Sequence, residues 1–178
     1  MATVDLPEGV RVATDAGGII VEGPLGKIRR AFPGSALALT GEKGKVTLTL
    51  RLPPRKPTRA LLLTWAAHLR NMAAGVTRGY EAKLKAVAAH FPMKVQAKGD
   101  HILIENFLGE KYPRRSSLVP GTQAQVNGDE VLLSGIDIEA VGQSAANLER
   151  TTHIREYDPR VFQDGIYITQ KPRAKGED

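Results

Sequence analysis

The chain has 178 residues, of which 42% are hydrophobic and 25% charged, a composition typical of a soluble globular protein with one or two domains. Lys and Arg outnumber Asp and Glu by 25 to 19, which favours a polyanionic partner such as nucleic acid. Cysteine is absent, which excludes disulfides and thiolate metal sites. Because the sequence shows neither a signal-peptide pattern nor an apolar run long enough to cross a membrane, we expect a cytoplasmic protein.

The first part of the chain predicts two β-hairpins. Residues 10–13 and 19–21 are strand-like and flank a connection that ends in Gly17-Gly18, residues that accept a positive φ at little cost. Residues 37–40 and 46–50 flank a second connection that contains glycine. The later of these two runs alternates apolar residues with threonine, the pattern of a half-buried strand. We therefore expect an antiparallel sheet here.

A helix is predicted after a proline-rich segment. Residues 53–57 contain three prolines and end the sheet, because proline lacks the N–H that a strand ladder needs, while Pro57 suits a helix's first turn. From residue 58 to residue 74 the apolar residues recur at intervals of three and four, which places them on one face. They are Leu62, Trp65, Ala66, Leu69, Met72 and Ala73. This face is expected to cover the sheet.

The second part of the chain predicts the same order of elements. Residues 93–97 and 102–105 form one predicted hairpin, and residues 123–126 and 130–134 form another around Asn127-Gly128, a strong hairpin signal. A helix with an apolar face of similar spacing should follow, from residue 138 to residue 151, with Asp137 as its N-cap. Residues 83–87 alternate charged with apolar side chains, which indicates an extra strand between the two parts.

Two short sequences occur once in each part and in the same order. Ile20–Lys27 is similar to Leu103–Glu110, which begins 83 positions later. Trp65–Arg70 is similar to Ser144–Glu149, which begins 79 positions later. Self-similarity of this kind indicates an internal duplication.

The duplication predicts an α+β fold of two tandem similar domains, each an antiparallel β-sheet with one helix packed on a face. We expect the first domain at residues 1–79 and the second at residues 80–169. Residues 170–178 should form a flexible basic tail, because they contain no large apolar residue to anchor them.

No residue pattern indicates a cofactor or a metal site. The four histidines share no spacing that would place two of them on one helical face. Glu22 and Glu105 occupy matching places in the two copies, and two carboxylates can do acid–base chemistry, so a two-domain enzyme is the rival hypothesis. Equivalent positions in tandem copies usually lie far apart, which disfavours catalysis.

Basic clusters indicate a nucleic-acid partner more directly. The second Leu-Gly pair is followed by a first group of candidate contacts, namely Lys111, Tyr112, Arg114 and Arg115. Arginine can hold phosphate oxygens through two parallel hydrogen bonds, and tyrosine can stack on an exposed base. A second group lies in the C-terminal extension and comprises Arg155, Tyr157, Arg160, Lys171, Arg173 and Lys175. For both groups the alternative is a solvated surface without a partner.

The charge is distributed unevenly between the two parts of the chain. Residues 1–79 hold 12 basic and 5 acidic side chains, a net charge of +7, whereas residues 80–178 hold 13 and 14, a net charge of −1. Arg29, Arg30 and Arg55 in the first part are therefore further candidates for contact with a polyanion.

Several longer motifs resemble one protein family. Asn106–Lys111, Gly135–Ala146 and Val161–Tyr167, together with Leu6–Val10 and Val21–Gly26, are similar to the sixth protein of the large ribosomal subunit, in its archaeal and eukaryotic form. The resemblance extends over essentially the whole chain.

This resemblance implies two similar α+β domains and a structural role without catalysis. It implies binding to large-subunit rRNA near the base of the acidic stalk and the sarcin-ricin loop, beside neighbouring ribosomal proteins. The second domain and the C-terminal extension are expected to make much of the rRNA contact. Neither a membrane nor a small-molecule substrate is expected. The alternative is a non-ribosomal protein-interaction or RNA-binding module without catalysis.

Overall fold

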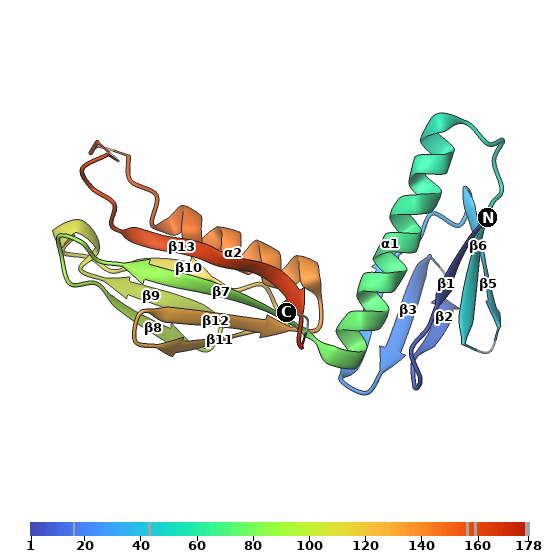
Figure 1. Ribbon diagram of the computed structural model, residues 1–178, viewed down its shortest axis with the longest axis horizontal. Helices are drawn as coiled ribbons and strands as arrows, with labels where there is room; N and C mark the ends of the chain where they lie inside the picture. Colours follow the sequence, from blue (N-terminus) through green and yellow to red (C-terminus); the bar gives the residue numbers. More distant parts are fainter. Residues whose placement is uncertain (16, 43, 156, 159, 177–178) are drawn as a thin grey trace. The chain divides into compact units, whose positions relative to one another are not determined.

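The computed structural model describes residues 1–15, 17–42, 44–155, 157–158 and 160–176. These residues form an α+β fold, as predicted, with helices packed against small antiparallel sheets (Figure 1). The chain divides into two compact units, Met1–Gly79 and Tyr80–Asp178, which we call unit 1 and unit 2.

Unit 1 contains two three-stranded antiparallel sheets, with the strand orders β2-β3-β4 and β1-β6-β5, and the helix α1. The bounds are β1 Ala2–Asp5, β2 Arg11–Asp15, β3 Gly18–Gly23, β4 Gly26–Ala31, β5 Leu37–Glu42, β6 Lys45–Leu50 and α1 Lys56–Arg78. The two predicted hairpins are confirmed as β2–β3 and β5–β6. Strands β1 and β4 were not predicted, and the two hairpins lie in separate sheets where one sheet was expected.

Helix α1 extends beyond the predicted residues 58–74 at both ends, to Lys56 and Arg78. The N–H of Arg55 donates a hydrogen bond of 2.8 Å to Oγ1 of Thr58, which satisfies a backbone donor at the helix start. The predicted apolar face is buried against β1, β3, β4 and β6, and Phe32 meets Trp65 edge to face with 5.0 Å between ring centroids. The helix ends before Gly79, whose φ of 75° suits glycine.

Unit 2 contains a three-stranded sheet, β10-β9-β8, a four-stranded sheet, β11-β12-β7-β13, and the helix α2. The bounds are β7 Tyr80–Val87, β8 Lys94–Lys98, β9 His101–Glu105, the 3-10 helix η1 Phe107–Gly109, β10 Arg114–Ser117, β11 Thr122–Asn127, β12 Glu130–Gly135, α2 Ile138–Thr151 and β13 Gly165–Ala174. The predicted hairpins are confirmed as β8–β9 and β11–β12. Helix α2 has the predicted bounds, and Asp137 accepts a hydrogen bond of 3.0 Å from the N–H of Glu139 at its start.

The two units repeat one arrangement of strands. Strands β3 and β9 are each the middle strand of a three-stranded sheet, and the order β1-β6-β5 in unit 1 corresponds to β7-β12-β11 in unit 2. The repeated helix sequence also buries the same positions, which are Trp65, Ala66 and Leu69 on α1 and Ser144, Ala145 and Leu148 on α2. The repeat in the sequence therefore corresponds to a repeat in the structure.

The units differ in the connection that follows the repeated glutamate. In unit 1, strands β3 and β4 are joined through the two residues Pro24-Leu25, and Gly23 pairs with Gly26. In unit 2, strand β9 ends at Glu105 and β10 begins at Arg114, so a longer loop that contains η1 takes the place of this turn. The second Leu-Gly pair therefore lies in a 3-10 helix and not in a hairpin turn.

Among the described residues, unit 2 also has an edge strand, β13, with no counterpart in unit 1. The sequence predicted a flexible tail from residue 170, but residues 170–174 lie in β13, which pairs antiparallel with β7 (Figure 1). Pro172 is compatible with this strand because β13 lies at the sheet edge and its register shifts between Ile168 and Arg173. Residues 175–176 follow the strand, and residues 177–178 lie outside the described residues.

We predict that deleting residues 170–178 lowers the stability of unit 2. The deletion removes the pairs that Gln170, Arg173 and Ala174 make with β7 and exposes the surface beneath the buried Ala174. Several lost backbone hydrogen bonds and a partly uncovered core should reduce the free energy of unfolding by about 2–3 kcal/mol. Urea unfolding measures this change, with deletion of residues 175–178 alone as the control. Equal urea midpoints for the two deletions would show that the pairing of residues 170–174 contributes no stability.

Candidate nucleic-acid interface

The loop between β9 and β10 is folded around one buried aromatic side chain. Phe107 is buried, while Asn106 and Leu108 on either side of it have left-handed φ values of 58° and 49°. Beyond η1, Lys111 and Tyr112 point into solvent, and Tyr112 is 76% exposed. The loop therefore has a fixed base and presents a cation and an aromatic ring.

The side chain of Arg114 packs against the buried Phe107 at the base of the loop and points toward the protein. Its guanidinium lies 4.2 Å from the centroid of the Phe107 ring. Nε donates a hydrogen bond of 2.9 Å to the carboxylate of Glu110, and Nη1 donates one of 2.7 Å to the carbonyl of Thr151 in the last turn of α2. Nη2 also contacts Glu110. Because all three guanidinium nitrogens have partners within the protein, Arg114 joins the loop to the end of α2.

An open hollow of about 420 Å³ lies where this loop meets the end of α2. Its lining includes Glu110, Arg114, Arg150, His153, Arg155 and Tyr157. Arg155 and Tyr157 belong to the second predicted group of contacts, and Arg114 belongs to the first. The fold thus brings part of both groups to one place, which the sequence did not predict.

Arg115 is exposed and contacts the neighbouring strand. Its Nη2 lies 3.1 Å from Nε2 of His101, and Nδ1 of His101 lies 2.6 Å from the carboxylate of Asp100. The hydrogen bond from His101 holds the pKa of Asp100 below its usual value. Arg115 is therefore positioned by these contacts while its side chain stays accessible.

A second basic surface lies on the four-stranded sheet of unit 2. Helix α2 packs against one face of this sheet (Figure 1). Leu84 of β7 is buried on that face, and Lys83 and Lys85 on either side of Leu84 are exposed on the opposite face. On β13, Tyr167 pairs with Lys85 and therefore shares this face. We call this opposite face, together with the exposed residues of β13, the open sheet face.

Strand β13 adds Lys171 and Arg173 to the open sheet face. Both are exposed, and Pro172 between them lies toward α2, with its Cγ 3.5 Å from where a Cβ of Gly142 would be. Arg173 pairs in register with Glu81, so the face also contains carboxylates. No ion pair joins a carboxylate to Lys83, Lys85, Lys171 or Arg173 within the described part of the chain. These cations are therefore available to a partner.

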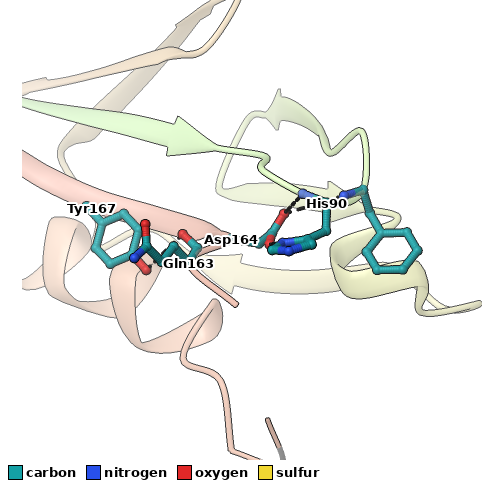
Figure 2. A network of polar contacts seen from close by, with 5 residues as sticks. His90, Gln163, Asp164 and Tyr167 are labelled. Atoms are coloured by element: carbon teal, nitrogen blue, oxygen red, sulfur yellow. Dashed lines mark hydrogen bonds and ion pairs between the residues drawn. The ribbon is translucent and has the colours of Figure 1, made fainter. Parts of the chain in front are cut away.

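Asp164 anchors the start of β13 (Figure 2). Its carboxylate is buried, with Oδ2 lying 2.8 Å from Nδ1 of His90 and Oδ1 accepting a hydrogen bond of 2.9 Å from the N–H of the same residue. Burial raises the pKa of Asp164, but the hydrogen bonds donated by His90 and Phe91 outweigh it and bring the pKa below its usual value. The ionised carboxylate thus joins the segment after β7 to the start of β13.

Three aromatic rings in contact, tilted relative to one another, extend this anchor toward the hollow. The centroid of the Phe162 ring lies 4.8 Å from that of His90 and 4.7 Å from that of Tyr157. Tyr157 remains 49% exposed at the hollow. The His90–Asp164 contact and the contacts between the three rings therefore hold the Tyr157 side chain where a partner can reach it.

Nine of the ten predicted contact residues are exposed, and only Arg114 is half-buried. Arg160 lies in a turn, where its N–H donates a hydrogen bond of 2.9 Å to the carboxylate of Asp158. Lys175 follows β13. Lys83 and Lys85 were not among the predicted contact residues, although they alternate with apolar residues in the sequence. This alternation identifies an exposed sheet face only when β7 is known to pair with β12 on one side and β13 on the other.

Within the described part of the chain, no group of histidine, aspartate and glutamate side chains is arranged to hold a metal ion. Among the same residues, no helix is long and apolar enough to span a membrane.

Comparison with known proteins identifies relatives along almost the whole chain. The family model described as Ribosomal protein L6 matches residues 91–165. A protein of Methanosarcina mazei is 43% identical over 169 residues, which cover 95% of this chain and 96% of that protein. A protein of Methanospirillum hungatei is 44% identical over 170 residues, covering 94% and 95% of the two chains. A protein of Ignicoccus hospitalis is 43% identical over 171 residues, covering 94% and 92%. All three are named large ribosomal subunit protein uL6.

Relatives of this identity and coverage place the chain among the structural proteins of the ribosome and not among the enzymes. The chain belongs to the family of large ribosomal subunit protein uL6, as the sequence resemblance predicted.

We predict that Asp164→Asn destabilises the protein at neutral pH and removes part of its acid sensitivity. Because the pKa of Asp164 is lower in the folded than in the unfolded state, the ionised carboxylate stabilises the fold above about pH 4. This contribution disappears as the pH falls through the lower folded-state pKa. At pH 7 the substitution should reduce the free energy of unfolding by about 1–3 kcal/mol.

Urea unfolding of both proteins at pH 7 and pH 3 measures this effect. The stability difference between them should shrink at pH 3, and Asp129→Asn, which changes an exposed carboxylate, should leave stability nearly unchanged at both values. A difference of the same size at both pH values would contradict the role of the ionised carboxylate.

Proposed function

We propose that this protein is a structural component of the large ribosomal subunit that binds large-subunit rRNA near the stalk base and the sarcin-ricin region, beside neighbouring ribosomal proteins. The ribosomal role is supported by the three relatives described above, which carry the name of one large-subunit protein. The region of the rRNA is supported by the family resemblance alone. The surfaces that make the contact are proposed from the geometry of unit 2.

The open sheet face carries the proposal. Lys83 and Lys85 of β7 and Lys171 and Arg173 of β13 are exposed cations without a carboxylate partner among the described residues. Tyr167 on the same face is 44% exposed. Such a surface contacts phosphate and ribose groups through charge and shape, and these contacts position a protein on folded RNA without reading its sequence.

The loop after β9 and the hollow beside it form the second contact. Lys111 and Arg115 supply charge to phosphates from the loop, and Tyr112 supplies an exposed ring for stacking. Across the hollow, Arg155 likewise offers a positive charge for phosphates, and Tyr157 offers an exposed ring for stacking. Arg160 and Lys175 are exposed cations that add to the two contacts. Arg114 acts as a positioning residue, because its guanidinium is occupied by Glu110 and the end of α2.

We predict that neutralising the open sheet face weakens binding to rRNA and lowers its salt dependence. Each phosphate contact contributes roughly 0.7–0.9 to the slope of the logarithm of the binding constant against the logarithm of salt concentration. The variant Lys83→Gln, Lys85→Gln, Arg173→Gln should therefore reduce the magnitude of this slope by about 2. Binding to deproteinised large-subunit rRNA, measured at several salt concentrations between 50 and 200 mM, tests the prediction.

The matched control for this experiment is Lys94→Gln, Lys98→Gln, which changes exposed lysines on β8 in the same unit. The control should leave the salt slope within about 0.5 of the unsubstituted protein. Equal slopes for the open-sheet-face variant and the unsubstituted protein would exclude this face from the interface. Binding of the unsubstituted protein that does not respond to salt would contradict the proposed function as a whole.

A further inference from the structure

The longest helix of the protein contains no acidic residue. Residues 43–80 hold eight Lys or Arg side chains and no Asp or Glu, and helix α1 lies within this range. Four of its own residues, Lys56, Arg59, Arg70 and Arg78, are basic and exposed. A charge run of one sign along a whole helix is unusual for a solvated surface, where both signs are normally mixed.

These four cations lie on the face of α1 that points away from the core. The buried side chains of α1 fall on the opposite side, and the spacing of 3.6 residues per turn places the four basic residues within an arc of roughly 100°. Lys56 and Arg78 are separated by about 33 Å along the helix axis. Leu63 lies among them and is 63% exposed. We call this surface the basic face of α1.

The cations on this face have no acidic partners within the described part of the chain. Nε of Arg70 donates a hydrogen bond of 3.3 Å to the carbonyl of Ala66 in the preceding turn. No carboxylate contacts Arg55, Lys56, Arg59, Arg70 or Arg78 among the described residues. Their charge is therefore balanced only by solvent and counterions.

The N-terminal end of α1 also carries positive charge, although positive charge at this end of a helix is destabilising. The positive end of a helix dipole favours carboxylates, yet the first turn has none, its first residue is Lys56, and the N-cap before it is Arg55. The sequence thus keeps an arrangement that opposes helix stability. A polyanion lying on this face would offset the repulsion.

The second copy of the helix shows that the fold does not require these charges. Helix α2 buries its side chains in the same pattern, but its exposed side chains include Glu139, Glu149 and Arg150, so its net charge is −1. The two helices share the buried face that the fold needs, whereas the charges on their exposed faces differ. The basic face of α1 is therefore specific to unit 1.

From these observations we infer that the basic face of α1 is a second RNA-binding surface, located on unit 1, that lies along a phosphate backbone. It deepens the proposed rRNA-binding function and rests on it. Arg59 and Arg70 near the middle of the helix present guanidinium groups that suit phosphate oxygens, and Lys56 and Arg78 extend the contact toward the helix ends. Binding here requires only charge and shape, which suits a helix without exposed aromatic side chains.

The test compares two double substitutions in the full-length protein. Arg59→Gln, Arg70→Gln removes two cations from the basic face, and Arg11→Gln, Lys27→Gln removes two exposed cations from the β2-β3-β4 sheet of the same unit. Glutamine is a good helix former, so both variants should fold, which circular dichroism and thermal unfolding verify. The probe is deproteinised large-subunit rRNA, bound at several salt concentrations.

We expect the α1 variant to bind rRNA at least about tenfold more weakly at 100 mM salt and to lower the magnitude of the salt slope by about 1.5. The control variant should bind like the unsubstituted protein. If the unsubstituted protein binds with a steep salt dependence and both variants match it, the inference about α1 is overturned while the proposed function stands. If the unsubstituted protein itself fails to bind rRNA, the proposed function fails first.

Incorporation into large subunits separates RNA from a protein partner on the same face. The α1 variant should be depleted from reconstituted subunits in proportion to its weaker binding to free rRNA. A variant that binds free rRNA normally but is depleted from subunits would show that an acidic protein occupies the face, which would overturn the inference.

Discussion

The pairing of β13 with β7 is the interaction on which the proposed RNA surface depends. Strand β7 corresponds to β1 of unit 1, where no further strand among the residues that the structure describes pairs with that edge. In unit 2 the added strand extends the sheet and brings Lys171 and Arg173 beside Lys83 and Lys85. The buried Asp164 carboxylate fixes where β13 begins, because it accepts hydrogen bonds from the segment that follows β7. Without this pairing, Lys171 and Arg173 would not lie on the same surface as Lys83 and Lys85.

The internal duplication separates the requirements of folding from those of binding. Both units keep a helix with the same buried positions and the same order of three strands, since these features bury the apolar residues. They differ in three places, which are the loop after β9, the added strand β13 and the exposed face of α1. All three present basic side chains to solvent. Most of the proposed contacts with RNA therefore lie where the copies diverge, while Lys83 and Lys85 lie on β7, a strand that both units share.

The sequence predicted the elements whose signals are local. Asn127-Gly128 specifies a two-residue hairpin turn, and Asp137 caps α2, so both features follow from neighbouring residues. The ordering of residues 170–174 could not be read in this way, because it depends on a free sheet edge on β7, far away in the sequence. The role of Arg114 could not be predicted from the sequence either, because its contact with Thr151 forms only in the folded protein and its contact with Glu110 depends on the fold of the loop. The neighbouring sequence of a basic loop residue does not show whether its side chain is bound to other groups of the same protein.

Chemical labelling of lysines most directly tests the claim that the open sheet face contacts rRNA. The free protein and its complex with deproteinised large-subunit rRNA are each treated with an amine-acetylating reagent, and the extent of modification at each lysine is measured by mass spectrometry. Lys83, Lys85 and Lys171 are exposed in the free protein and should be strongly protected in the complex, whereas Lys94 and Lys98 on β8 should react equally in both. Protection of Lys94 and Lys98 with continued reactivity of Lys83 and Lys85 would contradict the account.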